Sequence, residues 1–363
     1  MKNSVYILLI TAALALASCR ESFIDTPPDD PGTGTSELHD ILYATAEPGN
    51  SWLIATMKVD GSSSHDLLRL SDNVLFLSKP SKDKYLYYNY QSSFPPPTKI
   101  SLMLATIDST DRRLVKEINY LEAASLSPDA TKILYTIQTQ FKHELHVMNI
   151  DGTSDIMLAK DIEDGFMPAF SPDGNRVAFV TTDRKGGPGN HKDSLIVMNI
   201  NGSGRIKLLD DHDEFDNKTL SWSPDGKQIL IIIKDKNKYE MMLVNTDGTG
   251  KRELYEEEDG VLSAASFSPD GSKIVCTRFE YGKVSIASMS VSSDYYEILY
   301  TDPVCELKYP TFSNDGKHIL FVAEDSKSVP PDSAGTHDMK LLDISTKTTQ
   351  ILSQNTYIAH WKR

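Results

Sequence analysis

The chain has 363 residues and carries 37 Lys and Arg against 51 Asp and Glu, so its formal net charge is −14. This acidic balance argues against nucleic-acid binding and against a basic role at a membrane surface. A chain of this length could form two domains. The repeats described below favour one, because each repeat can bury its faces only against its neighbours.

The first residues have the pattern of an export signal. In "MKNSVYILLITAALALASC" one Lys precedes an apolar run from Val5 to Ala17, which is shorter than the roughly 20 residues that span a bilayer. The run ends in "LASC", which resembles a bacterial lipobox. We therefore predict a lipoprotein signal peptide over residues 1–18 and lipidation of Cys19. An ordinary secretory signal with an incidental Cys is the alternative.

Residues 19–37 follow as a polar stretch rich in turn formers, "CRESFIDTPPDDPGTGTSE". This composition is typical of a flexible tether. A lipid-anchored Cys19 followed by such a tether predicts a protein of the bacterial cell envelope, held at the outer membrane, on its periplasmic or its surface side.

One phrase recurs along the rest of the chain. "FSPDG" begins at Phe170 and Phe267, "WSPDG" at Trp222 and "FSNDG" at Phe312, while "LSPDA" (126–130) is a variant and "LSKPSKDK" (77–84) is degenerate. From Ser78 to Ser313, the successive phrase serines are 49, 44, 52, 45 and 45 residues apart. Pro, Asp and Gly each favour a tight turn, so the phrase predicts a turn between two strands. A catalytic Asp is the alternative, but a catalytic site needs unlike groups that converge.

A second sequence marker follows the repeated turn phrase within the same unit: "VMNIDGT" (147–153), "VMNING" (197–202) and "LVNTDGT" (243–249). Each unit then holds four short strands, here called a to d, which is the pattern of a β-propeller blade. The copies resemble the TolB-type propeller repeat over about residues 40–363. The sequence therefore predicts an all-β fold, a TolB-like (WD-like) β-propeller over residues 38–363.

The number of blades depends on how the two ends of this region are interpreted. Residues 40–71 supply strands b, c and d with no strand a before them, and "YIAHWKR" (357–363) resembles the run before each turn phrase. If this C-terminal strand pairs with the N-terminal strands, the ring closes with seven blades and has no exposed sheet edge. Six blades, with the N-terminal strands packed outside the ring, is the alternative.

The resemblance implies a fold but leaves the function open, since such propellers occur in envelope proteins, in accessory domains of peptidases and in some lyases. The chain contains no G-x-S-x-G nucleophile elbow. Two hypotheses remain. The favoured one is an envelope-anchored, non-catalytic module that binds a protein or glycan partner. The alternative is a metal-assisted polysaccharide lyase or hydrolase.

The two faces of a propeller differ in what they can offer a partner. The a–b and c–d turns carry the repeated phrases and share one face. The b–c and d–a connections share the other and include the long, individual segments 89–99, 181–194 and 322–338. Function usually lies in variable loops on a rigid scaffold. We therefore expect the repeated phrase to be scaffold and the site to lie on the opposite face.

Three predicted d–a loops are acidic: 161–165, 210–216 and 255–260. They belong to consecutive blade junctions, so they should create a focused negative field near the channel mouth. A docking site for a basic partner segment or a cation would have these leading contacts: Asp211, Asp213, Glu214, Asp216, Glu257 and Asp259. A solvated acidic rim is the alternative.

The histidines give no clear metal-ligand pattern. His143 and His146 are three apart at the start of a predicted strand, so they should point to opposite faces. Four others could in principle gather on the loop-bearing face, but nothing in their spacing shows it, and solvated loop histidines are the favoured interpretation: His191, His212, His337 and His360. The segment 210–217 lacks the Gly and closing Glu of a calcium loop. We assign no catalytic residue and no cofactor, and leave a divalent cation open.

Two cysteines lie within the predicted propeller, Cys276 in a strand b and Cys305 before a strand a, in neighbouring blades. A secreted location permits a disulfide. Cys276 lies among apolar residues in mid-strand, which favours a buried thiol.

Overall fold

The computed structural model describes residues 40–362, apart from 48–50, 71–72, 91–98, 109, 140–141, 163–167, 184–191, 213, 236–237, 259, 294 and 326–335. The signal peptide and tether expected over 1–37 lie outside the described residues, as does most of each long loop. Within the described part of the chain, no helix is long and apolar enough to cross a membrane.

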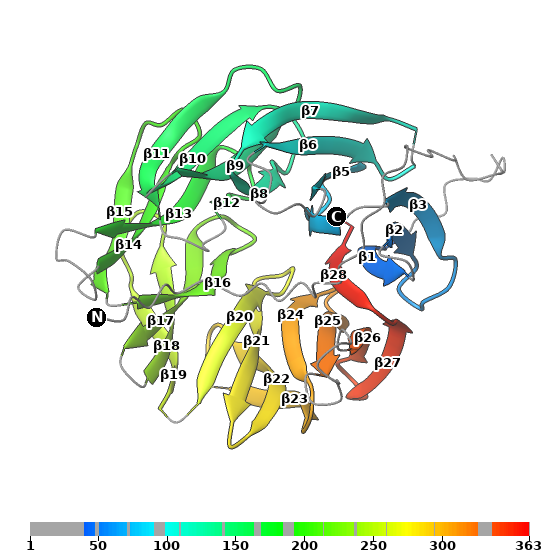
Figure 1. Cartoon of the computed structure of the whole chain (residues 1–363). Coiled ribbons are helices and arrows are strands. Elements are labelled where there is room, and N and C mark those ends of the chain that lie inside the picture. The colour runs from blue at the N-terminus through cyan, green and yellow to red at the C-terminus, as the bar shows by residue number, and fades with distance from the viewer. Residues whose placement is uncertain are drawn as a thin grey trace, which may run out of the picture.

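The described residues form seven four-stranded antiparallel blades arranged as a ring (Figure 1). The strands of each blade are named in order from the channel outward. Blade 1 is β28 (Thr356–Trp361), β1 (Ile41–Glu47), β2 (Ser51–Met57) and β3 (His65–Leu70). Blade 2 is β4 (Asn73–Leu77), β5 (Lys84–Tyr90), β6 (Lys99–Thr106) and β7 (Arg112–Asn119). Blade 3 is β8 (Leu121–Leu126), β9 (Lys132–Thr139), β10 (Lys142–Asn149) and β11 (Ile156–Ile162).

The remaining four blades follow in chain order. Blade 4 is β12 (Ala169–Phe170), β13 (Arg176–Asp183), β14 (Lys192–Asn199) and β15 (Ile206–His212). Blade 5 is β16 (Glu214–Trp222), β17 (Gln228–Asp235), β18 (Lys238–Asn245) and β19 (Arg252–Glu257). Blade 6 is β20 (Val261–Phe267), β21 (Lys273–Glu280), β22 (Lys283–Ser290) and β23 (Tyr296–Asp302). Blade 7 is β24 (Glu306–Phe312), β25 (His318–Asp325), β26 (Thr336–Asp343) and β27 (Thr348–Ser353).

The core lies between the blades, which explains why the second strand of a blade is apolar at nearly every position. In β17, "QILIIIKD", the side chains of Ile229, Ile231 and Ile233 pack against blade 4. The alternate side chains of Leu230 and Ile232 pack against blade 6. A strand that is buried on both faces cannot show the apolar–polar alternation of a half-exposed strand.

The C-terminal strand closes the ring. β28 pairs with β1 from Ile41↔Trp361 to Ala44↔Ile358, and Figure 1 shows the two side by side at the join. The Trp361 Nε1–H also donates to the carbonyl of Thr311 in blade 7, at 3.1 Å. The seven-blade prediction and its composite blade are therefore confirmed, and the six-blade alternative is wrong.

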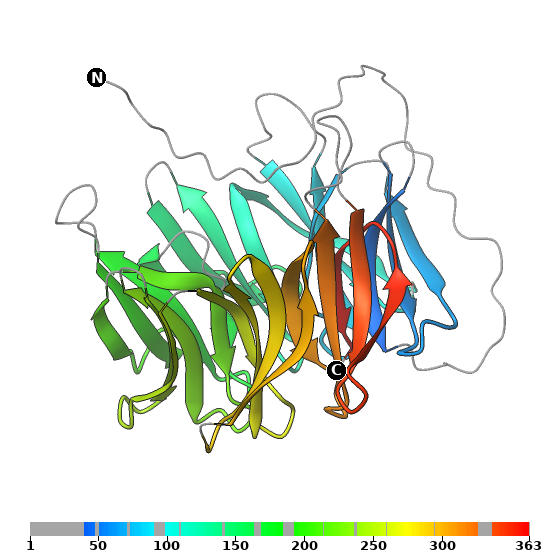
Figure 2. The same ribbon diagram turned by 90° about the horizontal axis from the view of Figure 1, so that it is seen from below.

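The two ends of the ring carry different connections, as the side view in Figure 2 shows. We call the end with the a–b and c–d turns the turn face, and the end with the b–c and d–a connections the loop-bearing face. Ile41, the first residue of β1, pairs with Trp361 at the turn face. The chain therefore enters the ring from that side.

The repeated phrase builds the turn face. In blade 5 the backbone N–H of Gln228 donates to Ser223 Oγ at 2.9 Å, and the Ser223 hydroxyl donates to Asp225 at 2.7 Å. This hydroxyl, with the backbone N–H of Lys227, holds the pKa of Asp225 below its usual value. A hydrogen-bonded, ionised Asp beside a Gly with positive φ (Gly226, 69°) closes the turn.

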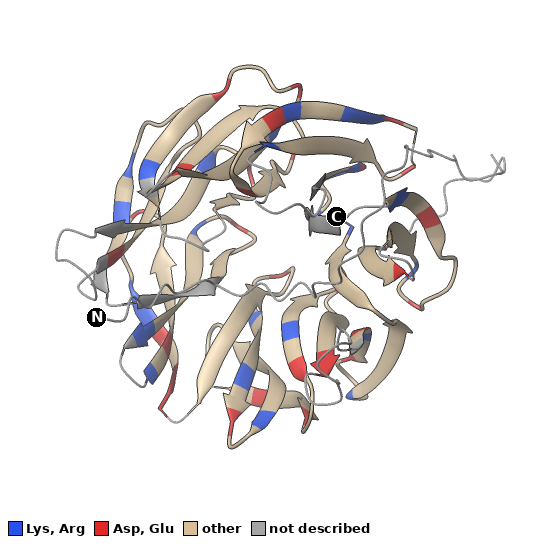
Figure 3. Cartoon of the chain, viewed as in Figure 1, with Lys and Arg blue, Asp and Glu red and all other residues tan. Residues whose placement is uncertain are grey.

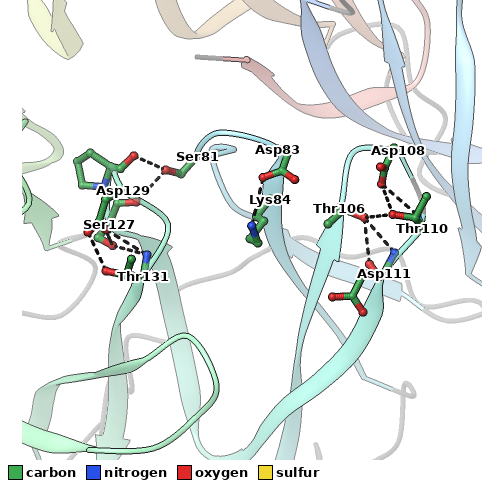
Figure 4. Close-up of polar contacts among 11 residues, drawn as sticks. Ser81, Asp83, Lys84, Thr106, Asp108, Thr110, Asp111, Ser127, Asp129 and Thr131 are labelled. Atoms are coloured by element: carbon green, nitrogen blue, oxygen red, sulfur yellow. Dashed lines mark hydrogen bonds and ion pairs between the residues drawn. The ribbon is translucent and has the colours of Figure 1, made fainter. Parts of the chain in front are cut away.

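The same turns also join neighbouring blades. The Gly226 carbonyl accepts a hydrogen bond from Arg176 of blade 4 at 2.7 Å. Between blades 2 and 3, the Ser81 hydroxyl reaches the carbonyls of Ser127 and Pro128, beside the Asp129 turn (Figure 4). The turn residues are therefore occupied by the scaffold itself, as the sequence predicts.

Candidate functional site

The acidic segment 210–216 lies almost wholly within strands. β15 continues to His212 and β16 begins at Glu214, so Asp211, Glu214 and Asp216 are strand residues. Pairing of His212 with β14 and of Glu214 and Phe215 with β17 extends the strands into this stretch, although the register shifts on either side of these pairs. The prediction of a d–a loop here is wrong. Asp213 lies outside the described residues.

The segment crosses the junction between blades 4 and 5. Asp211 lies on the outermost strand of blade 4, whereas Asp216 lies on the innermost strand of blade 5, beside the channel. The acidic residues therefore lie along a path from the rim of the loop-bearing face to its centre. At the next junction Asp259 also lies outside the described residues.

Glu257 is a buried side chain. It is only 5% exposed and forms an ion pair with the Arg278 guanidinium, while Tyr255 donates to it at 3.3 Å. Arg278 also pairs with Glu280 at 2.5 Å and lies over the Tyr296 ring, 5.7 Å from its centroid. Glu257 thus joins blade 5 to blade 6 and offers little charge to a partner. The sequence signal for this pair is Arg278, a charged residue that directly follows the buried positions 274–277 of β21.

A second charged network lies at the loop-bearing end of blade 7. Lys308 contacts Glu324 and lies 3.4 Å from Glu306, and His337 lies 3.4 Å from the other oxygen of Glu324. His337 stacks on Tyr357 of blade 1 with ring centroids 4.0 Å apart. Figure 3 shows acidic and basic segments beside each other on β24 and β25. The network ties blade 7 to blade 1 and surrounds an exposed carboxylate, that of Glu306, which is 60% exposed.

Exposed apolar side chains gather at the loop-bearing end of blades 6 and 7. Phe279 is 45% exposed, Tyr281 81% and Tyr309 57%, and Val261 beside them is 38% exposed. These four residues, which we call the aromatic patch, come from the ends of β20 and β21, the adjoining hairpin and β24. Tyr and Phe at such a density are typical of protein interfaces.

A pocket of about 300 Å³ opens within this patch, between blades 6 and 7. We call it the blade 6–7 pocket. Its lining residues come from three strands of blade 6 and from β24: Val261, Ser263, Ala264, Thr277, Phe279, Val284, Glu306, Leu307, Lys308 and Tyr309. The sequence pattern does not reveal this pocket, because its lining residues are ordinary strand residues that the blade junction brings together.

The four histidines suggested as a metal cluster do not converge in the part of the chain that is described. His337 lies at the loop-bearing end of β26, whereas His360 lies near the turn face and its Nε2 contacts the Leu77 carbonyl at 3.0 Å. The backbone of His212 lies in β15, and His191 lies outside the described residues.

His143 and His146 contact different carboxylates. The Nδ1 of His143 lies 2.8 Å from Glu122, whereas the Nε2 of His146 lies 3.2 Å from Glu144. Among described residues, one acidic trio could hold a cation: Glu240, Glu253 and Glu256 on the outer strands of blade 5. Lys238 pairs with Glu256 at 2.9 Å, so an ordinary surface ion pair accounts for part of that trio.

The two cysteines are free thiols, as expected for a buried Cys276. Burial raises the pKa of the Cys276 thiol to about 12, so this group stays protonated and unreactive.

Comparison with known proteins places the fold. A family model described as the TolB β-propeller domain matches residues 38–256. Among curated relatives, the Tol-Pal system protein TolB of Actinobacillus succinogenes is 34% identical over 80 residues, and that of Erwinia tasmaniensis is 32% identical over 82 residues. Each match covers 22% of this chain and 17% of the relative, so the chain spans less than a fifth of the length of these proteins.

Solved structures with the same fold have diverse activities. TolB from Acinetobacter baumannii superposes with a TM-score of 0.56 at 13% identity, covering 89% of this chain and 66% of that one. An oligogalacturonate lyase from Vibrio parahaemolyticus gives 0.62 at 13% identity, covering 86% and 85%. A puromycin-hydrolyzing peptidase from Mycobacterium tuberculosis gives 0.60 at 12%, covering 86% and 53%. Likeness at this level of identity establishes the fold alone.

Proposed function

Because the chain belongs to the TolB β-propeller domain family, we propose that it is a non-catalytic binding module of the bacterial cell envelope. Its loop-bearing face binds a partner protein. The observation that carries this proposal is the aromatic patch of Phe279, Tyr281, Tyr309 and Val261 on that face. The turn face, in contrast, uses its polar groups to join one blade to the next.

The acidic charge of the module indicates that the partner segment is basic. The net charge is −14, and the described acidic candidates Asp211, Glu214 and Asp216 lie at the junction of blades 4 and 5. A partner segment that combines Lys or Arg with apolar side chains would satisfy both the acidic junction and the aromatic patch. The relatives named as Tol-Pal system proteins are consistent with a protein partner in the envelope.

A defined probe can test this proposal without knowledge of the natural partner. Random peptides displayed on phage would be selected against the intact chain, and the winning peptides would be labelled and measured by fluorescence anisotropy. We expect sequences that contain Lys or Arg beside aromatic or branched residues. Their binding should weaken as salt rises, because the Debye length shrinks from about 10 Å at 0.1 M to about 3 Å at 1 M.

Charge reversal locates the binding face. Asp211→Lys combined with Glu214→Lys should weaken binding of the selected peptide at least about tenfold. The control is Glu117→Lys combined with Glu253→Lys, which changes the net charge equally on the outer strands of blades 2 and 5. An equal loss in both double variants, or no basic peptide at all, would contradict the proposal.

We also propose that Cys19 anchors the module to a membrane by lipidation. The apolar run up to Ala17 and the "LASC" sequence support this. Since the chain enters the ring at the turn face, an anchor before residue 41 would leave the loop-bearing face free for a partner. Mass analysis of the membrane-extracted protein should find acyl chains on Cys19. A Cys19→Ala protein that remains in the membrane fraction would refute lipid anchoring.

The alternative of a metal-assisted polysaccharide lyase or hydrolase rests on likeness of fold to oligogalacturonate lyases. No group of described histidines supports it at the loop-bearing face, where His337 is engaged with Glu324 and Tyr357. We therefore favour the binding module.

A further inference from the structure

The blade 6–7 pocket is an unfilled part of a contact that is otherwise well packed. Val261, Phe279 and Val284 lie opposite one another in register, and so do Ser263 and Thr277 one row below. Residues in one row, and residues two apart on a strand, point to the same face of a sheet. All five side chains therefore point from blade 6 toward β24 of blade 7.

Packing along this face changes with depth. Below the pocket, Val275 and Ile286 pack against Leu307 and Phe312 of blade 7 in a closed apolar cluster. Toward the loop-bearing end the pocket stays open among the described residues, and Phe279 of blade 6 and Tyr309 of blade 7 both line it. Natural interiors leave few voids of this size, so an open, lined pocket at the rim is a candidate site for part of a ligand.

Two residues that line the pocket carry hydroxyl groups without a hydrogen-bond partner among the described residues. Neither Ser263 Oγ nor Thr277 Oγ1 makes a hydrogen bond to any described residue, and both atoms are buried. Thr277 is only 7% exposed. Buried polar atoms are nearly always hydrogen-bonded, because leaving them unpaired is unfavourable. Two adjacent exceptions in one pocket point to a ligand that supplies the missing bonds.

The backbone on both sides of the pocket is strained. Ala264 has φ of 53° and Tyr309 has φ of 54°, conformations that residues other than Gly rarely adopt. Each lies at a β-bulge, where the register of the inner strand shifts against its neighbour. Bulges turn side chains away from the regular alternation and occur often beside functional sites. Here they lie on the two inner strands that line the pocket.

Charge at the rim is acidic. Lys308 is shared between Glu324 and Glu306, so one of these two carboxylates is in excess. Glu306 is the exposed one of the pair. A cationic group beside the pocket would therefore find a carboxylate that is only partly neutralised.

We propose that the blade 6–7 pocket receives one aromatic or branched apolar side chain of the basic partner segment. An amide group of that segment bonds to Ser263 and Thr277, and a neighbouring Lys or Arg pairs with Glu306. This assignment rests on the proposed function, and it names the chemistry of the residue that the module selects. An amide fits two hydroxyls because it has both a donor and an acceptor.

The lining favours a peptide over a sugar. Val261, Val284 and Leu307 line the pocket with aliphatic side chains, whereas the two unpaired hydroxyls are adjacent to each other on blade 6. A sugar ring carries hydroxyls around its whole edge, and several of these would face aliphatic carbon and lose their hydrogen bonds. An apolar side chain beside a single amide group offers apolar surface to the aliphatic lining and a donor and an acceptor to the two hydroxyls.

Binding of the phage-selected peptide to two pocket variants and one control variant tests the pocket. Val261→Trp fills the mouth and should weaken binding at least about tenfold. Thr277→Val keeps the shape and removes one hydroxyl, so it should weaken binding about three- to tenfold. The same variant should unfold at an unchanged or higher temperature, because it removes an unpaired buried polar group. Weaker binding without a loss of thermal stability would assign Thr277 a role in binding, because a purely structural role predicts a lower unfolding temperature.

Val304→Trp is the matched control. Val304 is 44% exposed on the same face but does not line the pocket, so this variant should bind the peptide normally. If the peptide binds Val261→Trp and Thr277→Val at full affinity while charge reversal still weakens it, the pocket assignment fails and the proposed function stands. If no peptide is selected, both fail. Pocket-dependent binding of acidic or neutral oligosaccharides in the same assay would overturn the choice of a peptide.

Discussion

Ala130 occupies the position in the repeated turn that glycine holds in the four later copies. Its φ is 56°, whereas Gly174, the corresponding residue of the next blade, has φ of 72°. The Asp129 side chain accepts hydrogen bonds from the Ser127 hydroxyl and from the Thr131 backbone, so the turn keeps its polar contacts. Ala130 therefore adopts the left-handed conformation that the turn requires, at an energetic cost that glycine would not carry.

This position allows a reciprocal test. Ala130→Gly should raise the free energy of unfolding by about 0.5–1 kcal/mol, because relief of the left-handed strain exceeds the extra flexibility of the unfolded chain. Gly174→Ala should lower it by a similar amount. An added Cβ at 174 would lie 3.5 Å from Pro128, an ordinary contact, so the loss would come from φ alone.

Urea unfolding would measure both variants. Gly202→Ala is the control, since Gly202 has φ of 83° and open space around its Cβ position. It should lose as much stability as Gly174→Ala. A destabilised Ala130→Gly protein would show that Ala130 contributes packing that outweighs its backbone strain.

Single residues also show where sequence reasoning about the site ends. The charge of Glu257 is visible in the sequence, but its partner Arg278 lies 21 residues away on another blade, so its burial is a tertiary property. The hydroxyls of Ser263 and Thr277 are ordinary strand residues until the junction with blade 7 leaves them without partners. Local pattern locates the acidic segments, and it cannot locate the pocket, which forms only where blades 6 and 7 meet.

At the scale of one element, β28 stabilises the closure of the ring through side chains on both of its faces. Trp361 is buried among apolar side chains of blades 1 and 7 and bonds to Thr311. His360, the next residue back, reaches the Leu77 carbonyl in blade 2. Alternating side chains of one short strand therefore join the composite blade to both of its neighbours.

His360 should make this join sensitive to acid. Burial lowers its pKa to about 4, below the usual 6.5. As pH falls from about 7 toward 4, the unfolded chain takes up the proton first, so the free energy of unfolding declines across this window. Between about pH 7 and pH 5 we expect His360 to contribute about 1–2 kcal/mol of that decline. The contribution is fully present above pH 6.5.

Urea unfolding of the parent and of His360→Gln at about pH 7 and pH 5 would test the assignment. The variant should be less stable at the higher pH and should lose less on acidification. His65→Gln is a matched control, since His65 is an exposed residue at the outer edge of blade 1. Equal acid losses in the parent and in His360→Gln would assign the titration to other groups.

At the scale of the whole molecule, the repeats predicted most of the fold. Spacings of 44–52 residues between turn phrases located the blades, because each blade repeats the same four-strand unit. The composite blade was predictable because "AHW" matches the inner-strand pattern. Strand ends were harder to predict, as the segment 210–216 shows. Its charged residues look like a loop locally, and pairing with neighbouring strands makes them continue the sheet.

Closure by β28 predicts the effect of truncation. Removal of residues 357–363 would delete most of a paired strand and the buried Trp361, so the melting temperature should fall by about 5–10 °C. The free edge of β1 should also promote association between molecules. Thermal melting and sedimentation would report both effects. A Trp361→Phe variant, which keeps the strand, should remain monomeric. A truncated monomer with an unchanged melting temperature would contradict the role of β28.

The pairing of Ile41 with Trp361 also bears on the order in which the ring folds. These residues are 361 − 41 = 320 positions apart, whereas Trp222 and Ile229 within blade 5 are 229 − 222 = 7 apart. The free-energy cost of the chain entropy lost on closing the longer loop exceeds that of closing the hairpin by about 3 kcal/mol. Blades 2 to 7 can therefore assemble from local hairpins, whereas blade 1 is complete only after β28 has paired with β1. Completion of blade 1 is the step at which folding of this protein should be slowest.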